Sequence, residues 1–78
     1  MATIEQIKAA RVLLGWLQED LAAHSGVSLP TVKRLEAPGK FRVSDETKAK
    51  MKAALEAAGI VFTNGNEPGV RLRKRGKK

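Results

Sequence analysis

The sequence predicts a mostly helical domain of four helices that ends in a short β-hairpin. Four stretches before residue 59 combine a helix-start signal with apolar residues at helical spacing. Two short apolar runs follow, separated by a connection rich in turn residues. The chain has 78 residues and no cysteine, so we expect one small domain that depends on well-patterned helices or on self-association for its stability.

The first helix is expected over roughly residues 4–14. Thr3 and Gln6 have the spacing of a capping box, in which each side chain binds the backbone amide of the other residue. Gly15 supplies a C-terminal stop. Apolar residues recur at helical intervals between these two signals, at Ile4, Ile7 and Leu14.

A second helix is expected from about Gln18 to His24. Acidic residues in its first turn suit the positive end of the helix dipole, and Trp16 and Leu21 have the spacing of a hydrophobic staple. The N-cap position falls on Leu17, whose side chain cannot accept a hydrogen bond. We therefore expect this helix to lose about 1 kcal/mol relative to one with a serine cap.

The third helix is expected from Leu29 to about Glu36. Residues 25–28 read as a tight turn, Ser28 caps the helix, and Pro30 lies in the first turn, where proline is tolerated. Two short helices separated by a turn therefore lie in succession.

A fourth helix is expected between Ser44, as its cap, and Gly59, as its stop. Residues 37–39 break the chain before it, and Phe41 or Val43 is expected to anchor the intervening loop to the core. The two runs after this helix, residues 60–62 and 70–72, favour a β-hairpin with a long loop.

Residues 18–36 carry the strongest functional pattern. A DNA-binding helix-turn-helix needs a small residue where its helices cross, a glycine where the turn needs positive φ, and apolar residues at both ends of the packed interface. Six positions of the chain have the required types at the required spacing: Gln18, Ala22, Gly26, Val27, Val32 and Leu35.

With these positions, the chain resembles the Cro/cI-type (XRE-like) helix-turn-helix regulators over roughly residues 4–58. The segments that carry the resemblance run from Arg11 to Ala22, from Gly26 to Ser28 and from Thr31 to Glu36. The resemblance implies a lambda-repressor-like bundle that regulates transcription by binding double-stranded DNA sequence-specifically, with the third helix in the major groove and a dimer on an inverted repeat.

The chain departs from the family pattern at two places. Leu17 replaces the usual Ser, Thr or Asn cap, and a β-hairpin stands where many relatives have a fifth helix. The family also pairs the residues that match Arg11 and Glu36, so the resemblance implies a partly buried structural salt bridge between them.

Helix geometry selects the candidate DNA contacts, because residues opposite the buried Val32 and Leu35 face the groove. Arg34 can place two donors on a guanine, Lys33 can bind the same atoms or a phosphate, and Gln18 is placed to bind a phosphate. The alternative for the two basic residues is a merely solvated face. The full candidate set is Gln18, Ser28, Leu29, Pro30, Thr31, Lys33 and Arg34.

Charge is concentrated at the C-terminus of a chain whose net charge is +7. We expect residues 1–72 to form the DNA-binding domain with its hairpin, and residues 73–78 to be a disordered basic tail. The tail is expected to act on phosphates through Arg73, Lys74 and Arg75.

Self-association is expected through the hairpin, because a two-stranded hairpin is marginal in water and Cro-like relatives can dimerise through C-terminal strands. We expect an antiparallel strand contact between two copies, and thus a homodimer. The alternative is a hairpin that caps the fourth helix in a monomer that dimerises only on DNA. The supporting apolar side chains are Ile60, Phe62, Val70 and Leu72.

Other classes of function find little support in the composition. One histidine and no cysteine allow no metal set in one chain, and no glycine-rich phosphate loop follows a strand, so we expect no enzyme, cofactor or small-molecule ligand. The apolar runs are too short for a membrane span and no signal segment is present, which favours a cytoplasmic protein. The alternative functions are a protein-interaction module, such as an anti-repressor or antitoxin, and, as a minor reading, RNA binding through the tail.

Overall fold

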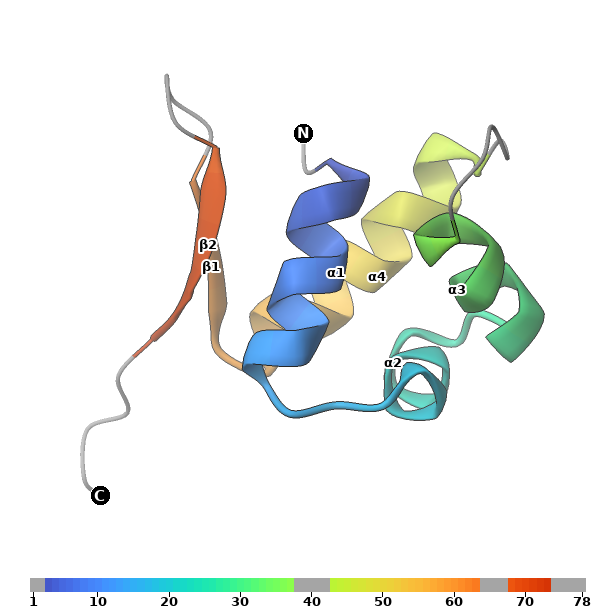
Figure 1. The fold of residues 1–78 in the computed structure, drawn as a ribbon, viewed down its shortest axis with the longest axis horizontal. Coiled ribbons are helices and arrows are strands. Elements are labelled where there is room, and N and C mark those ends of the chain that lie inside the picture. The colour runs from blue at the N-terminus through green and yellow to red at the C-terminus, as the bar shows by residue number, and fades with distance from the viewer. Residues whose placement is uncertain (1–2, 38–42, 64–67, 74–78) are drawn as a thin grey trace.

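The computed structural model describes residues 3–37, 43–63 and 68–73. It has four helices and a two-stranded antiparallel hairpin, which confirms the predicted fold class (Figure 1). The elements are α1 (Ile4–Leu13), α2 (Gln18–Ser25), α3 (Leu29–Glu36), α4 (Asp45–Ala57), β1 (Ile60–Thr63) and β2 (Gly69–Leu72). Phe41, one of the two expected loop anchors, lies outside the described residues, whereas Val43 packs against the core.

The helices begin at the predicted caps. At α1 the Thr3 hydroxyl accepts from the Gln6 amide (3.1 Å) and the Gln6 side-chain oxygen accepts from the Thr3 amide (2.8 Å), so the capping box is complete. Ser28 caps α3 and Ser44 caps α4, each by accepting from the amide three residues later.

The start of α2 is capped from the other direction. Leu17 accepts nothing through its side chain, as expected, but the Asp20 carboxylate accepts from the Leu17 amide at 2.8 Å. Half of a capping box is therefore present, and it offsets part of the stability that we expected this helix to lose. The helix ends at Ser25, because Gly26 takes the left-handed conformation with φ of +74°.

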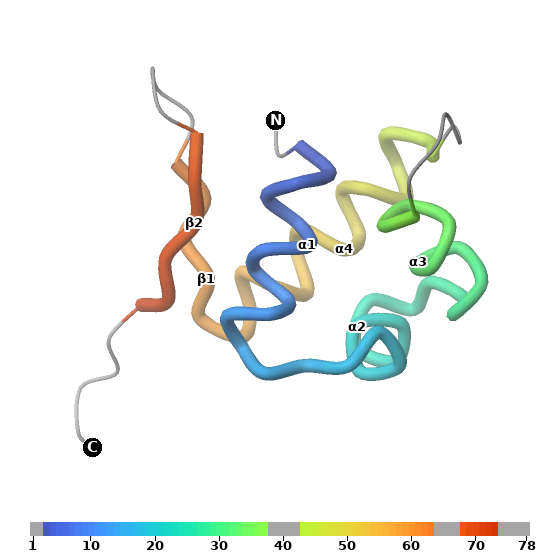
Figure 2. The backbone as a smooth tube through the Cα atoms, in the orientation of Figure 1, coloured from blue at the N-terminus to red at the C-terminus, as the bar shows by residue number. Residues whose placement is uncertain are grey.

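The core lies between α1, α4 and the two-helix unit of α2 and α3. Figure 2 shows α1 and α4 in the middle of the molecule, with α2 and α3 on one side and the hairpin on the other. Every element except β2 contributes at least one side chain to the buried set, which consists of Ile7, Ala10, Leu21, Val27, Val32, Leu35, Met51, Leu55 and Ile60.

The hairpin pairs Ile60 with Leu72 and Phe62 with Val70 in register. Strand alternation brings these apolar side chains to one face, where Ile60 is buried and Phe62 and Val70 pack against the core. The position of Ile60 corrects our expectation that its side chain supports the contact between two copies. Ile60 is only 1% exposed, so its side chain lies inside its own protomer and has no surface to offer a partner.

Gln6 fastens the hairpin to α1. Its side-chain nitrogen donates to the carbonyls of Thr63 (2.9 Å) and Gly69 (2.8 Å), the last pair of the described ladder. The side chain is 4% exposed and uses both amide hydrogens and its oxygen, so a buried polar group is satisfied while three segments are joined.

Candidate nucleic-acid interface

The packing between α2 and α3 fixes the face that α3 turns to solvent. Leu21 of α2 and Val32 and Leu35 of α3 are 2% exposed or less, and Val27 in the turn is 9% exposed. Gly26 supplies the left-handed residue that lets the chain turn between the two helices. The outer side of α3 is therefore the one opposite Val32 and Leu35.

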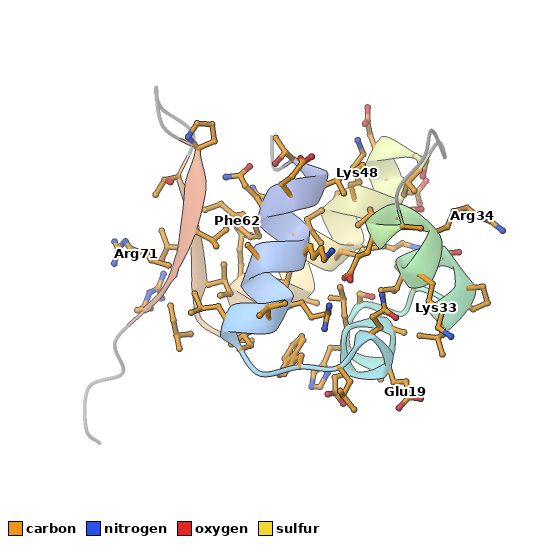
Figure 3. All side chains as sticks on the ribbon, in the orientation of Figure 1. Glu19, Lys33, Arg34, Lys48, Phe62 and Arg71 are labelled. Carbon is orange, nitrogen blue, oxygen red and sulfur yellow. The ribbon has the colours of Figure 1, made fainter. Side chains whose placement is uncertain are left out.

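Lys33 and Arg34 lie on this outer side. Both are exposed, and neither forms an ion pair within the described part of the chain. Figure 3 shows Arg34 extending away from the body of the molecule. Their donors are thus available to a ligand. Pro30 is also exposed, and Leu29 is half-buried at the start of the same helix.

The hydroxyls of Ser28 and Thr31 are within hydrogen-bonding distance of each other, at 2.8 Å. Ser28 Oγ also accepts from the Thr31 amide, so both residues take part in capping α3. A contact of either hydroxyl with DNA would come in addition to this structural role.

A cleft of about 220 Å³ lies between the starts of α2 and α3, with Leu17, Glu19, Leu29 and Lys33 among its lining residues. The α2 amides that precede the first helical hydrogen bonds point toward this end of the helix. Gln18 also lines the cleft, but its side-chain nitrogen donates to Glu36 at 3.0 Å. In this conformation the backbone at the helix start, and not the Gln18 side chain, is free for a phosphate.

Arg11 and Glu36 form a bidentate ion pair, with Nε 2.8 Å from Oε2 and Nη2 2.9 Å from Oε1. The Glu36 side chain is only 3% exposed, and Gln18 donates to the same carboxylate. Arg11 also donates from Nη1 to the Trp16 carbonyl at 2.6 Å. The pair therefore links α1, the loop after it, and both helices of the motif, and it holds the end of α3 in place.

Trp16 and His24 make a contact that the sequence did not reveal. Their rings stack with centroids 4.3 Å apart and an interplanar angle of 20°. His24 Nδ1 lies 2.8 Å from the Asp20 carbonyl, which requires the ring to donate from that nitrogen. The stack packs the α1–α2 loop against α2, so Trp16 has a structural role.

Basic residues of the C-terminal strand lie far from α3. Arg71 and Arg73 are exposed, and Figure 3 shows Arg71 at the end of the molecule opposite Lys33 and Arg34. Lys74 and Arg75, the other tail residues expected to contact phosphates, lie outside the described residues.

Two other kinds of feature are absent from the described ranges. No group of three His, Cys, Asp or Glu side chains there could hold a metal ion. None of the helices in those ranges is long and apolar enough to cross a membrane.

Comparison with known families gives one match. The family model described as helix-turn-helix matches residues 7–47, which is more than half of the chain. The matched range runs from α1 through α2 and α3 into the start of α4. No curated protein matches the sequence.

Proposed function

The chain belongs to the helix-turn-helix family as a Cro/cI-like (XRE) DNA-binding regulator, and on this premise we propose that it binds an inverted repeat in duplex DNA as a homodimer. The observation that carries the proposal is the exposed basic face of α3, which forms no ion pair with any described residue and lies opposite a buried face that packs on α2. A helix held in this way can enter a major groove with the side-chain donors of Lys33 and Arg34 directed toward the bases.

In the proposed complex, Arg34 places two donors on O6 and N7 of a guanine, and Lys33 binds the same kind of atoms or a nearby phosphate. Leu29 and Pro30 lie at the start of α3 and supply apolar contact to a thymine methyl. Ser28 and Thr31 add polar contacts beside their capping bonds.

The start of α2 supplies the proposed phosphate contact. Its free backbone amides and the helix dipole both favour an anion, and this contact fixes the register of α3 without reading sequence. Gln18 joins the contact if its side chain turns from Glu36 toward the phosphate.

We propose that residues 1–72 are the folded DNA-binding domain and that Arg73, Lys74 and Arg75 attract phosphates as part of a basic tail. The C-terminal strands contribute to the dimer, with the exposed Leu72 as the side chain of this set that is most available to a partner.

One observation favours a second candidate, a helix-turn-helix protein-interaction module. Leu17 is 63% exposed at the start of α2, close to Leu29 across the cleft, so the same surface has an apolar portion. An acidic protein could use this portion together with Lys33.

Selection from a pool of random duplexes, followed by sequencing, distinguishes the two candidates. A DNA-binding regulator enriches a two-fold symmetric sequence, and the Arg34→Ala variant loses preference at one base pair of each half-site. Recovery of random sequences with the wild-type chain would contradict the DNA proposal and favour the interaction module.

A further inference from the structure

The outer side of α1 is an apolar surface that no residue in the described ranges covers. A shallow groove of about 430 Å³ is lined by Glu5, Lys8, Ala9, Val12 and Leu13. Val12 is 59% exposed and Leu13 is 46% exposed, although both belong to a helix whose other side is in the core. Large exposed apolar side chains in such a group are typical of an interaction site.

A second groove, of about 370 Å³, continues this surface to the hairpin. It shares Glu5 and Ala9 with the first groove and extends between α1 and β2 to Pro68 and Val70. We call the two grooves together the α1–β2 surface.

Among the described residues, none pairs with the edge of β2 that lies beside this surface. The hairpin has two strands, and the Arg73 amide donates to the Gly59 carbonyl across it at 2.6 Å. Since backbone groups along a strand point alternately to either side, those of Val70 and Leu72 point away from β1. An open edge of this kind can pair with another strand.

The α1–β2 surface has a specific orientation relative to α3, the helix proposed to enter the major groove. On α1, Arg11 faces α3 and Gln6 faces the hairpin, and the groove residues occupy the remaining side, away from the core. Figure 1 shows α3 and the hairpin at opposite ends of the longest axis, with α1 between them. The surface therefore faces sideways with respect to that axis.

This orientation favours one way of pairing two copies. A two-fold axis that runs parallel to the long axis brings two α1–β2 surfaces together and leaves both α3 helices at the same end, where one duplex can contact them. A dimer formed through the outer face of the hairpin would instead place the two α3 helices at opposite ends of the assembly.

The surface is also complementary to itself. Val12 and Leu13 are large and exposed, whereas the small Ala9 lines both grooves, so these side chains of one copy can fill groove space beside Ala9 of the other. The charged lining residues of the first groove are one acid, Glu5, and one base, Lys8. On a chain of net charge +7, the lining of this groove on α1 thus carries no net charge.

We infer that a second copy of this chain occupies the α1–β2 surface, with α1 packed against the partner's α1 and the β2 edges adjacent. The inference rests on the proposed function, because the orientation argument requires both α3 helices to contact one duplex. It adds the exposed face of α1 to the strand contact proposed above and makes this face the main apolar part of the interface.

Analytical ultracentrifugation and DNA binding test the inference with four variants of the full chain. Val12→Glu and Leu13→Glu each place a charge in the proposed interface. Ala53→Glu adds the same charge to an exposed position of α4, and Val61→Glu adds it to the strand opposite β2. Circular dichroism checks that each variant is folded, and a duplex with a single half-site measures binding by one protomer.

We expect the two α1 variants to weaken dimerisation by about tenfold or more, and Ala53→Glu and Val61→Glu to associate like the wild type. If the wild type dimerises only on DNA, we expect the two α1 variants to lose cooperativity on a duplex with two half-sites, and Ala53→Glu and Val61→Glu to bind it as cooperatively as the wild type. Single-site binding by the α1 variants should stay within about twofold of wild type. Unchanged association of both α1 variants, or dissociation by Val61→Glu alone, would overturn the inferred interface. If the wild type binds neither duplex, the proposed function itself fails.

Discussion

Arg11 and Glu36 are joined by two hydrogen bonds of 2.8 and 2.9 Å, and this pair connects α1 to Glu36, the last residue of α3. The Glu36 side chain is 3% exposed and that of Arg11 is 14% exposed, so both charges are largely withdrawn from water. A buried carboxylate needs its partners, and here Arg11 supplies two of the three hydrogen bonds while Gln18 supplies the third.

We predict that Arg11→Ala lowers the free energy of unfolding by about 3 kcal/mol, because it leaves a buried carboxylate with one side-chain donor. Urea denaturation followed by circular dichroism measures the change. Glu56→Gln is the control, since it breaks the more exposed Lys52–Glu56 pair (3.4 Å) and should change stability by less than about 0.5 kcal/mol. Equal effects of the two substitutions would show that the Arg11 pair is no stronger than a surface pair.

The second prediction concerns Gln6 and the hairpin. Gln6→Ala removes the donor to the Thr63 and Gly69 carbonyls and should destabilise the hairpin by about 1–3 kcal/mol. Amide hydrogen exchange should show reduced protection of the backbone amides first in β1 and β2. Thr3→Ala is the matched control, because it removes the other hydrogen bond of the same capping box and leaves both hairpin contacts of Gln6 in place. Equal exchange of the strand amides in the two variants would contradict a fastening role for Gln6.

The local features of the fold were predictable from the sequence because each depends on nearby residues. The caps at Thr3, Ser28 and Ser44 and the turn at Gly26 require only their own neighbours, and all four are present. The alternation that brings Ile60 and Phe62 to one face of the hairpin is equally local.

Contacts between distant segments were not predictable in the same way. Gln6 reads as a capping residue, and its second role depends on carbonyls 57 and 63 residues further along the chain. Strand alternation likewise predicts that the Ile60 side chain must be buried, but not whether its own helices or a partner bury it. In the structure, the helices of its own chain bury it. The Trp16–His24 stack depends on the path of the α1–α2 loop, for which the sequence has no periodic signal.

For the candidate nucleic-acid interface, the sequence predicts which face of α3 is exposed. It does not predict which hydrogen bonds the side chains beside this face form within the protein. Lys33 and Arg34 are exposed, as the helical spacing from Val32 and Leu35 requires. Gln18 has the position of a phosphate-binding residue, yet its side chain donates to Glu36, because that buried carboxylate accepts another hydrogen bond.

The third prediction is that Arg34→Ala weakens binding to the selected duplex by about 1–3 kcal/mol and removes the preference at one base pair per half-site. Fluorescence anisotropy with a set of single-base variants of the duplex measures both effects. Lys50→Ala on the exposed side of α4 is the control and should lower affinity without changing the pattern of base preference, if it has any effect. An unchanged pattern with Arg34→Ala would mean that this residue does not read a base.

The fourth prediction concerns the basic tail. Truncation after Leu72 should weaken binding to the selected duplex and to random DNA by similar factors, because it removes Arg73 and the basic residues that follow it. These residues come after β2, which lies at the end of the molecule opposite α3 (Figure 1), so we expect them to add attraction to phosphates without reading bases. Titrations at several salt concentrations should show a shallower dependence of log affinity on log salt. An unchanged slope would assign the tail no part in DNA binding.

The most direct test of DNA reading by α3 in two half-sites is methylation interference on the selected duplex, since methylation of guanine N7 blocks contacts in the major groove. We predict interference at guanines in two symmetric half-sites about one helical turn apart, and loss of interference at one guanine of each half-site with Arg34→Ala. Absence of interference at every guanine N7 of a guanine-containing site, with binding retained, would contradict the account.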